Sequence, residues 1–168
     1  RFSVVVIVDL SALDSLGTLE RHRENGAIGV RLTPSIRSSG DDPLAIWRKA
    51  DELGMLVSCM GNVNEFASDK FADIVKEFPN MPMIIEHLAG GGQSASFPGN
   101  GEGPEPPYTL FKKAMELSRF PNTYLKIHGL GEILNRPSAL QKDFDHDFFG
   151  PMPPLVEMAK EAFGVRRM

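Results

Sequence analysis

Five short runs of apolar, largely β-branched residues recur along the chain, and their spacing constrains the fold more than any other feature. The runs begin near residues 3, 28, 55, 82 and 123. The first four lie about 27 residues apart, the length of one strand with its covering helix in a parallel α/β sheet. Runs without polar alternation are typical of strands buried on both faces. We therefore predict five parallel strands: Ser3–Asp9, Ile28–Leu32, Met55–Met60, Met83–Leu88 and Thr123–His128.

The segments between these runs carry apolar residues at helical spacing. One such stripe falls at positions i, i+3, i+4 and i+7 and consists of Phe71, Ile74, Val75 and Phe78. This is the pattern of a helix with one buried face. Comparable stripes predict helices around Leu13–Leu19, Leu44–Leu53, Leu110–Leu117 and Leu155–Ala162.

Composition narrows the class of protein. The 168 residues suffice for one globular core, and the net charge of −4 argues against a nucleic-acid partner, which a basic surface would attract. No apolar run approaches the roughly 18 residues of a membrane span, and we expect no signal peptide before the first strand. The single cysteine, Cys59, is expected to be a small core residue and fits a reducing compartment. We therefore expect a cytoplasmic protein with a small-molecule partner, no nucleic acid and no membrane.

Two architectures alternate parallel strands with helices: the open, doubly wound sheet and the (β/α)8 barrel. An open sheet commonly carries a glycine-rich phosphate-binding turn after its first strand, but residues 9–12 read Asp-Leu-Ser-Ala. A barrel places its functional side chains where several strands end. Polar residues follow the strands here: Asp9, Arg31, Arg37, Asn62, His87, Lys126 and His128. We therefore predict an α/β protein of the (β/α)8 TIM-barrel class, with residues 1–168 forming one partial barrel domain of about five to six β-α units.

Glu86 and His87 end the fourth predicted strand. A polar pair at the end of a buried strand needs a reason, because burying polar groups without partners is costly. Side chains alternate along a strand, so His87 is expected to share the face of Ile85. If that face is the barrel interior, His87 is an active-site ligand or base; otherwise it is a core histidine bonded to the backbone. Glu86 would then face the helices or support a neighbouring side chain.

Lys126 and His128 form the corresponding pair on the fifth strand, on the face of Tyr124. A lysine inside a barrel is costly unless it pairs with an acid or an anionic substrate. Lys126 could therefore bind a carboxylate, form a Schiff base, or form an ion pair with Asp9 or Glu86. His128 is a candidate second base or metal ligand.

Arg31 closes the second strand, and Arg37 follows six residues later. Two guanidinium groups near one strand end suit an anionic substrate, because each can bind a carboxylate through two hydrogen bonds. The alternative is one structural ion pair and one surface arginine. Asn62, after the third strand, is a further candidate for substrate binding.

A glycine- and proline-rich insertion, residues 90–107, separates the fourth strand from the next helix. It holds six Gly and four Pro in 18 residues, a composition that excludes regular structure. At the catalytic end of a barrel, such a long loop is predicted to be an active-site loop.

Five segments, taken in order, carry a family resemblance over nearly the whole chain: Gly26–Leu32, Asp42–Trp47, Ile85–Gly90, Pro121–Gly129 and Ala162–Met168. They resemble the amidohydrolase superfamily, in particular its amidohydrolase-related branch of lactone hydrolases, dicarboxylate-lactone hydrolases and non-oxidative decarboxylases. The resemblance implies a metal-dependent (β/α)8 barrel. The family's His-x-His after the first strand and its Asp after the last strand have no counterpart here, so we expect the sequence to be a central fragment of a longer protein.

The resemblance also implies roles for individual residues. His87 matches a histidine that binds the metal or contacts the activated water, and Arg31 matches an arginine that often meets a substrate carboxylate. Lys126 matches a common lysine, whereas His128 stands where Ser or Pro is more usual. The catalytic candidates are thus His87, Lys126 and His128, with His87 also the metal ligand. The substrate-binding candidates are Arg31, Arg37, Asn62 and Lys126.

The implied activity is hydrolysis of a small anionic lactone, ester or related carbonyl compound. A divalent metal ion, expected to be Zn²⁺ with its other ligands outside this chain, would lower the pKa of a bound water so that hydroxide attacks the carbonyl. Two alternatives stay open. One is a non-oxidative decarboxylase on the same scaffold. The other is a catalytically incomplete fragment whose exposed strand edges pair with another chain. That chain could be a second copy, which would make a homo-oligomer.

Overall fold

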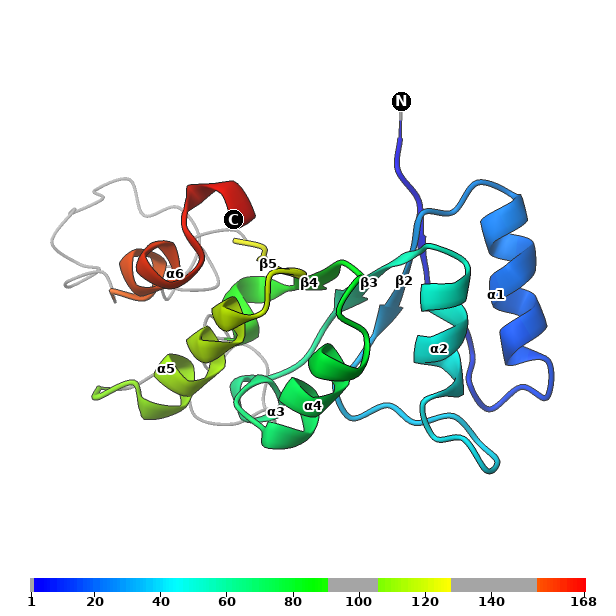
Figure 1. Cartoon of the computed structure of the whole chain (residues 1–168), viewed down its shortest axis with the longest axis horizontal. Coiled ribbons are helices and arrows are strands. Elements are labelled where there is room, and N and C mark those ends of the chain that lie inside the picture. Colours follow the sequence, from blue (N-terminus) through cyan, green and yellow to red (C-terminus); the bar gives the residue numbers. More distant parts are fainter. Residues whose placement is uncertain (1, 91–105, 128–153) are drawn as a thin grey trace, which may run out of the picture.

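The computed structural model describes residues 2–90, 106–127 and 154–168, and within them the chain forms one parallel five-stranded sheet (Figure 1). The strands are β1 (Val5–Val6), β2 (Gly29–Leu32), β3 (Leu56–Cys59), β4 (Met83–Ile85) and β5 (Thr123–Leu125). They lie in chain order, and each pairs in parallel with the next. All five predicted strands are present, although each is shorter than its apolar run.

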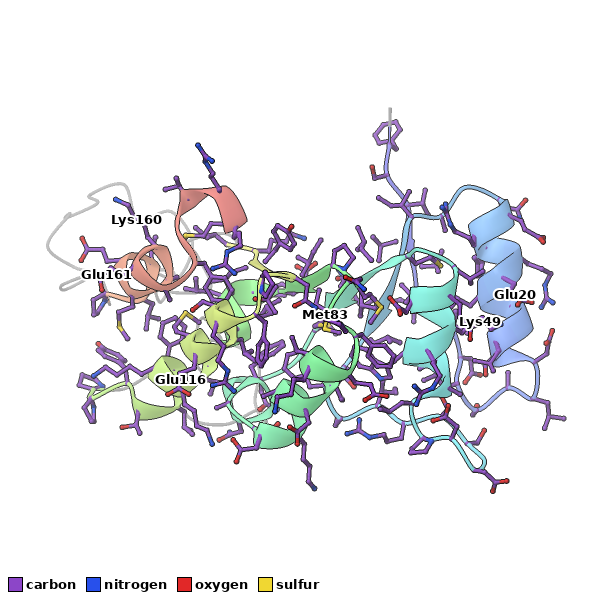
Figure 2. All side chains as sticks on the ribbon, viewed as in Figure 1. Glu20, Lys49, Met83, Glu116, Lys160 and Glu161 are labelled. Carbon is purple, nitrogen blue, oxygen red and sulfur yellow. The ribbon has the colours of Figure 1, made fainter. Side chains whose placement is uncertain are left out.

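Helices fill the connections between the strands. The α-helices are α1 (Ser15–Glu24), α2 (Ala45–Glu52), α3 (Val63–Phe66), α4 (Asp69–Glu77), α5 (Thr109–Met115) and α6 (Leu155–Phe163). The described residues also contain the short turns η1 (His87–Gly90), η2 (Glu116–Arg119) and η5 (Val165–Arg167). A salt bridge connects α1 and α2, in which Lys49 Nζ of α2 lies 2.9 Å from Glu20 Oε1 of α1 (Figure 2).

The strand order decides between the two predicted architectures. A doubly wound sheet reverses its order at a switch point and carries helices on both faces, whereas a barrel advances by one strand at each step. The order β1-β2-β3-β4-β5 advances without reversal. The chain therefore has the α/β fold of the TIM-barrel class, with five of the eight strands of a barrel in the described residues, as the sequence predicts.

One face of the sheet packs against the helices. Alternate strand residues, including Val30, Val57, Cys59, Met83 and Ile85, have no exposed surface, and Met83 lies near the middle of the molecule (Figure 2). They belong to one apolar core that takes side chains from all six of these α-helices. Cys59 is thus a core residue, as predicted. No helix in the described parts of the chain is long and apolar enough to cross a membrane.

Asn122 links β5 to the segment that precedes β4. Its buried side chain donates from Nδ2 to the carbonyl oxygens of Phe78 at 2.9 Å and Met81 at 3.1 Å. Its own carbonyl accepts a hydrogen bond from the Met83 amide at 2.9 Å. The side chain thus satisfies two carbonyls where α4 gives way to β4.

Replacing Asn122 with Ala should lower the free energy of unfolding by about 1–3 kcal/mol, because two buried carbonyls lose their donor. Urea unfolding followed by circular dichroism measures this loss. Asn25→Ala is the matched control, since Asn25 Nδ2 also donates to a carbonyl, that of Arg21, but at an exposed helix end. Equal losses in the two variants would contradict the assigned role of Asn122.

Candidate functional site

The sheet face opposite the helices carries the polar residues. Arg31 pairs in register with Ser58, Ser58 with Ile84, and Ile84 with Tyr124. Two residues further along their chains stand Glu86 and Lys126, which therefore project to the same face. Tyr124, on this side of the sheet, is 39% exposed within the described residues, and we call the side opposite the helices the open face.

Four of these side chains form one connected group, here called the Glu86 cluster: Arg31, Ser58, Glu86 and Lys126. The Lys126 ammonium lies 2.9 Å from Glu86 Oε2 and 3.2 Å from Oε1. Ser58 Oγ donates to Glu86 Oε1 at 2.8 Å. Arg31 approaches through two longer contacts, Nη2 to Glu86 Oε1 at 3.8 Å and Nε to Ser58 Oγ at 3.4 Å. Each member comes from a different one of four neighbouring strands or its end.

The acid lies beneath the two bases. The Glu86 side chain is 5% exposed, whereas the side chains of Arg31 and Lys126 are 35% and 57% exposed. Two positive charges and one negative charge give this cluster a formal charge of +1. The surface offered to solvent is therefore cationic, and an anion is the ligand that it suits.

Burial acts to raise the pKa of Glu86, because it removes water from the charged form. Hydrogen bonds from Lys126 and Ser58 and the charges of Lys126 and Arg31 act in the opposite direction and outweigh burial. The pKa of Glu86 therefore lies below its ordinary value of 4.5, and the carboxylate is charged at neutral pH.

A left-handed turn ends β4 three residues earlier than the sequence predicts. His87, Leu88 and Ala89 have φ values of 53°, 51° and 53°, a conformation that no strand adopts. Gly90 follows at φ 70°, where an added Cβ would lie 2.7 Å from the Val63 amide nitrogen. This close approach requires glycine, since any side chain would meet the start of α3.

The early end of β4 determines on which side of the sheet the side chains of Glu86 and His87 lie. Ile85 faces the helices and is fully buried, while Glu86 shares the open face of Ile84. Glu86 thus supports Lys126, one of the two roles left open by the sequence. His87 lies half-buried in the turn and no longer follows strand alternation. Its role as ligand or base stays a prediction.

Arg37 and Asn62 make local contacts outside the Glu86 cluster. Arg37 Nη1 donates to the carbonyls of Pro34 at 3.0 Å and Ile36 at 2.7 Å. Asn62 Oδ1 accepts from the Glu65 amide at 3.1 Å, and the Glu65 carboxylate accepts from the Asn62 amide at 3.0 Å, which is a capping box at the start of α3. Substrate binding by Arg37 and Asn62 stays a prediction.

Two predicted features fall outside the described residues: His128, and residues 91–105 of the glycine- and proline-rich loop. Among the residues described, no group of three or more His, Cys, Asp or Glu side chains could hold a metal ion. His87 and Glu86 by themselves do not make up such a group.

Ser58 is the member of the Glu86 cluster that sequence reasoning missed. It is 2% exposed and is the one polar residue of β3. A lone hydroxyl in a buried strand requires a hydrogen-bond partner on a neighbouring strand, and this was the available signal.

A cavity of about 570 Å³ lies beside the Glu86 cluster, along β4 and β5. Lys126 belongs to the cluster and also lines this cavity.

A sequence model described as Amidohydrolase matches residues 1–168, the whole chain. The chain belongs to the amidohydrolase family. No curated protein matches this amidohydrolase.

One solved structure supports the same fold. A probable 2-pyrone-4,6-dicarboxylic acid hydrolase from Acinetobacter baumannii, with citric acid bound, is 14% identical at a TM-score of 0.61. The match covers 97% of this amidohydrolase and 51% of that structure, so the chain spans about half its length.

Two further structures match with lower TM-scores. An amidohydrolase 2 from Bifidobacterium longum subsp. infantis is 17% identical at a TM-score of 0.44, over 96% of this chain and 61% of that one. A dihydroorotase from Campylobacter jejuni is 16% identical at a TM-score of 0.40, over 78% and 37% respectively.

The lowered pKa of Glu86 makes a prediction about acid stability. The charged carboxylate stabilises the fold above its unfolded-state pKa, and this contribution is lost as the pH falls through the lower folded-state pKa. As the pH falls below the ordinary glutamate pKa of 4.5, the free energy of unfolding of Glu86→Gln should therefore fall less steeply than that of the wild type. Urea unfolding at a series of pH values measures both slopes.

Glu24→Gln, on the exposed surface of α1, is the control for this comparison and should follow the wild-type slope. Parallel slopes for the wild type and Glu86→Gln would show that Glu86 carries no such linkage.

Proposed function

We propose that the whole protein hydrolyses a small substrate that carries a carboxylate beside a lactone, ester or related carbonyl group. The observation that carries this proposal is the Glu86 cluster, which presents a formal charge of +1 where the strands end. Chemistry in barrel enzymes takes place at that end of the strands. A substrate anion would therefore be bound beside the reacting carbonyl.

Arg31 is the residue proposed to bind the carboxylate. Its planar guanidinium can donate two parallel hydrogen bonds to one carboxylate, which fixes orientation as well as position. Lys126 is more exposed and forms an ion pair with Glu86 at 2.9 Å. Together with Arg31 it forms a positively charged surface, here called the cationic wall. The apolar part of the substrate would lie along the cavity beside β4 and β5.

The likeness to the Acinetobacter protein supports the class of substrate. That protein is a probable hydrolase of a dicarboxylic acid and holds citric acid, a compound with three carboxyl groups. The proposal takes from it only the class, a small carboxylate, because the two chains are 14% identical.

A divalent metal ion, with Zn²⁺ as the expected ion, belongs to the proposal through the family. When bound, such an ion supplies a hydroxide at neutral pH by lowering the pKa of its water. The described residues lack a set of three ligand side chains, so we derive no step through the ion from them. Their proposed contribution is to bind and orient the substrate.

The test is an assay of the whole protein against a panel of lactones and esters with and without a carboxylate. Arg31→Met should lower kcat/KM for the carboxylate substrates about 10- to 100-fold, because charge-assisted hydrogen bonds are lost. Neutral substrates should be affected far less. Arg48→Met is the control, since Arg48 forms its ion pairs with Asp42 and Glu77 on the surface.

Two results of this assay would overturn the proposal. Release of carbon dioxide without water consumption would assign the scaffold to decarboxylation instead. Activity that survives thorough chelation, with no metal found by elemental analysis, would remove the metal from the reaction.

A further inference from the structure

We propose that Glu86 and Ser58 are positioning residues that hold Arg31 in place for binding an anion, although neither touches the anion itself. This inference rests on the proposed function, because it concerns the same cationic wall. It goes further by assigning roles to two residues beneath that wall and by separating the roles of the two cations.

Burial excludes direct contact between these residues and a ligand. Ser58 is 2% exposed, and the Glu86 side chain is 5% exposed. Ser58 can therefore affect a ligand bound at the open face only through a neighbour, and Glu86 only through a neighbour or through the electric field of its charge.

The hydrogen-bond donors and acceptors give that path a direction. Ser58 has one hydroxyl hydrogen, which it donates to Glu86 Oε1 at 2.8 Å. Its lone pairs are then left to accept from Arg31 Nε at 3.4 Å. The negative charge of Glu86 thus fixes the hydroxyl, and the fixed hydroxyl orients the guanidinium.

The two cations are not equivalent in this arrangement. Lys126 Nζ lies within 3.2 Å of both oxygens of Glu86 and neutralises its charge. Arg31 contacts the acid at 3.8 Å and the hydroxyl at 3.4 Å, distances that are long for hydrogen bonds. The Lys126 ammonium is therefore paired with Glu86. Arg31 makes only long contacts with Glu86 and Ser58, so its N–H groups can donate hydrogen bonds to a ligand.

Positioning and simple charge balance predict opposite results for Glu86→Gln. If Glu86 only reduced the positive charge of the wall, its removal would strengthen anion binding. If it positions Arg31, its removal weakens anion binding even though the wall becomes more positive. The sign of the change in affinity separates the two.

The experiment measures the dissociation constant of citrate by titration calorimetry on the full chain at low ionic strength. Glu86→Gln and Ser58→Ala should each raise the citrate Kd about tenfold. In an Arg31→Met background the same two substitutions should change the Kd less than twofold, because the residue they act through is gone. Ser58→Thr, which keeps the hydroxyl, should restore wild-type affinity.

Controls separate positioning from folding and from nonspecific binding. Triethyl citrate, the uncharged ester, should bind equally weakly to every variant. Asp42→Asn removes an ion pair of Arg48 on the surface and should leave the citrate Kd unchanged. Ser58→Ala removes a single atom and carries the test alone if Glu86→Gln fails to fold.

Several outcomes would overturn the inference: tighter citrate binding by Glu86→Gln, additive effects in the Arg31→Met background, or no citrate binding by the wild type. Failure of the proposed function is distinguishable. A protein that binds citrate with this pattern of coupling but hydrolyses no lactone or ester would refute the hydrolase and leave the positioning roles intact.

Discussion

A buried carboxylate is stable in this sheet only because two cations and a hydroxyl surround it. Removing a carboxylate from water costs several kcal/mol, and the loss is offset only by well-placed partners. Glu86 has Lys126 at 2.9 Å, Ser58 at 2.8 Å and Arg31 at 3.8 Å. The partners come from the strands on both sides of β4, so the ion pair requires the sheet to be correctly paired. The polar face and the apolar core thus depend on the same register.

Much of the fold is predictable from the sequence because the apolar runs repeat at the interval of a β-α unit. The five strands, their parallel direction and the helices between them follow from that repeat and from the helical stripes. The end of β4 does not follow from it. Met83–Leu88 is apolar enough to continue as a strand, but the backbone enters a left-handed turn at His87, and Gly90 at the end of this turn packs closely against the start of α3.

The candidate site is only partly predictable, for reasons that lie in the same turn. Arg31 and Lys126 stand out because charged residues end otherwise apolar strands. Of the two roles that the sequence leaves open for Glu86, the structure shows the support of Lys126. Alternation does not extend to His87, because the left-handed turn begins there. Ser58 is missed because its importance depends on register between strands, which a single segment does not contain.

The Glu86 cluster takes its members from strands β2 and β3 and from the residues that directly follow β4 and β5. Arg31 and Ser58 are 27 residues apart, Ser58 and Glu86 28, and Glu86 and Lys126 40, yet each pair is in contact. The longest of these intervals includes the glycine- and proline-rich insertion. Connecting segments can therefore lengthen, shorten or diverge in sequence while the arrangement of charges stays fixed. In such a scaffold, changes in the loops can alter substrate specificity while the residues proposed to bind the anion keep their positions.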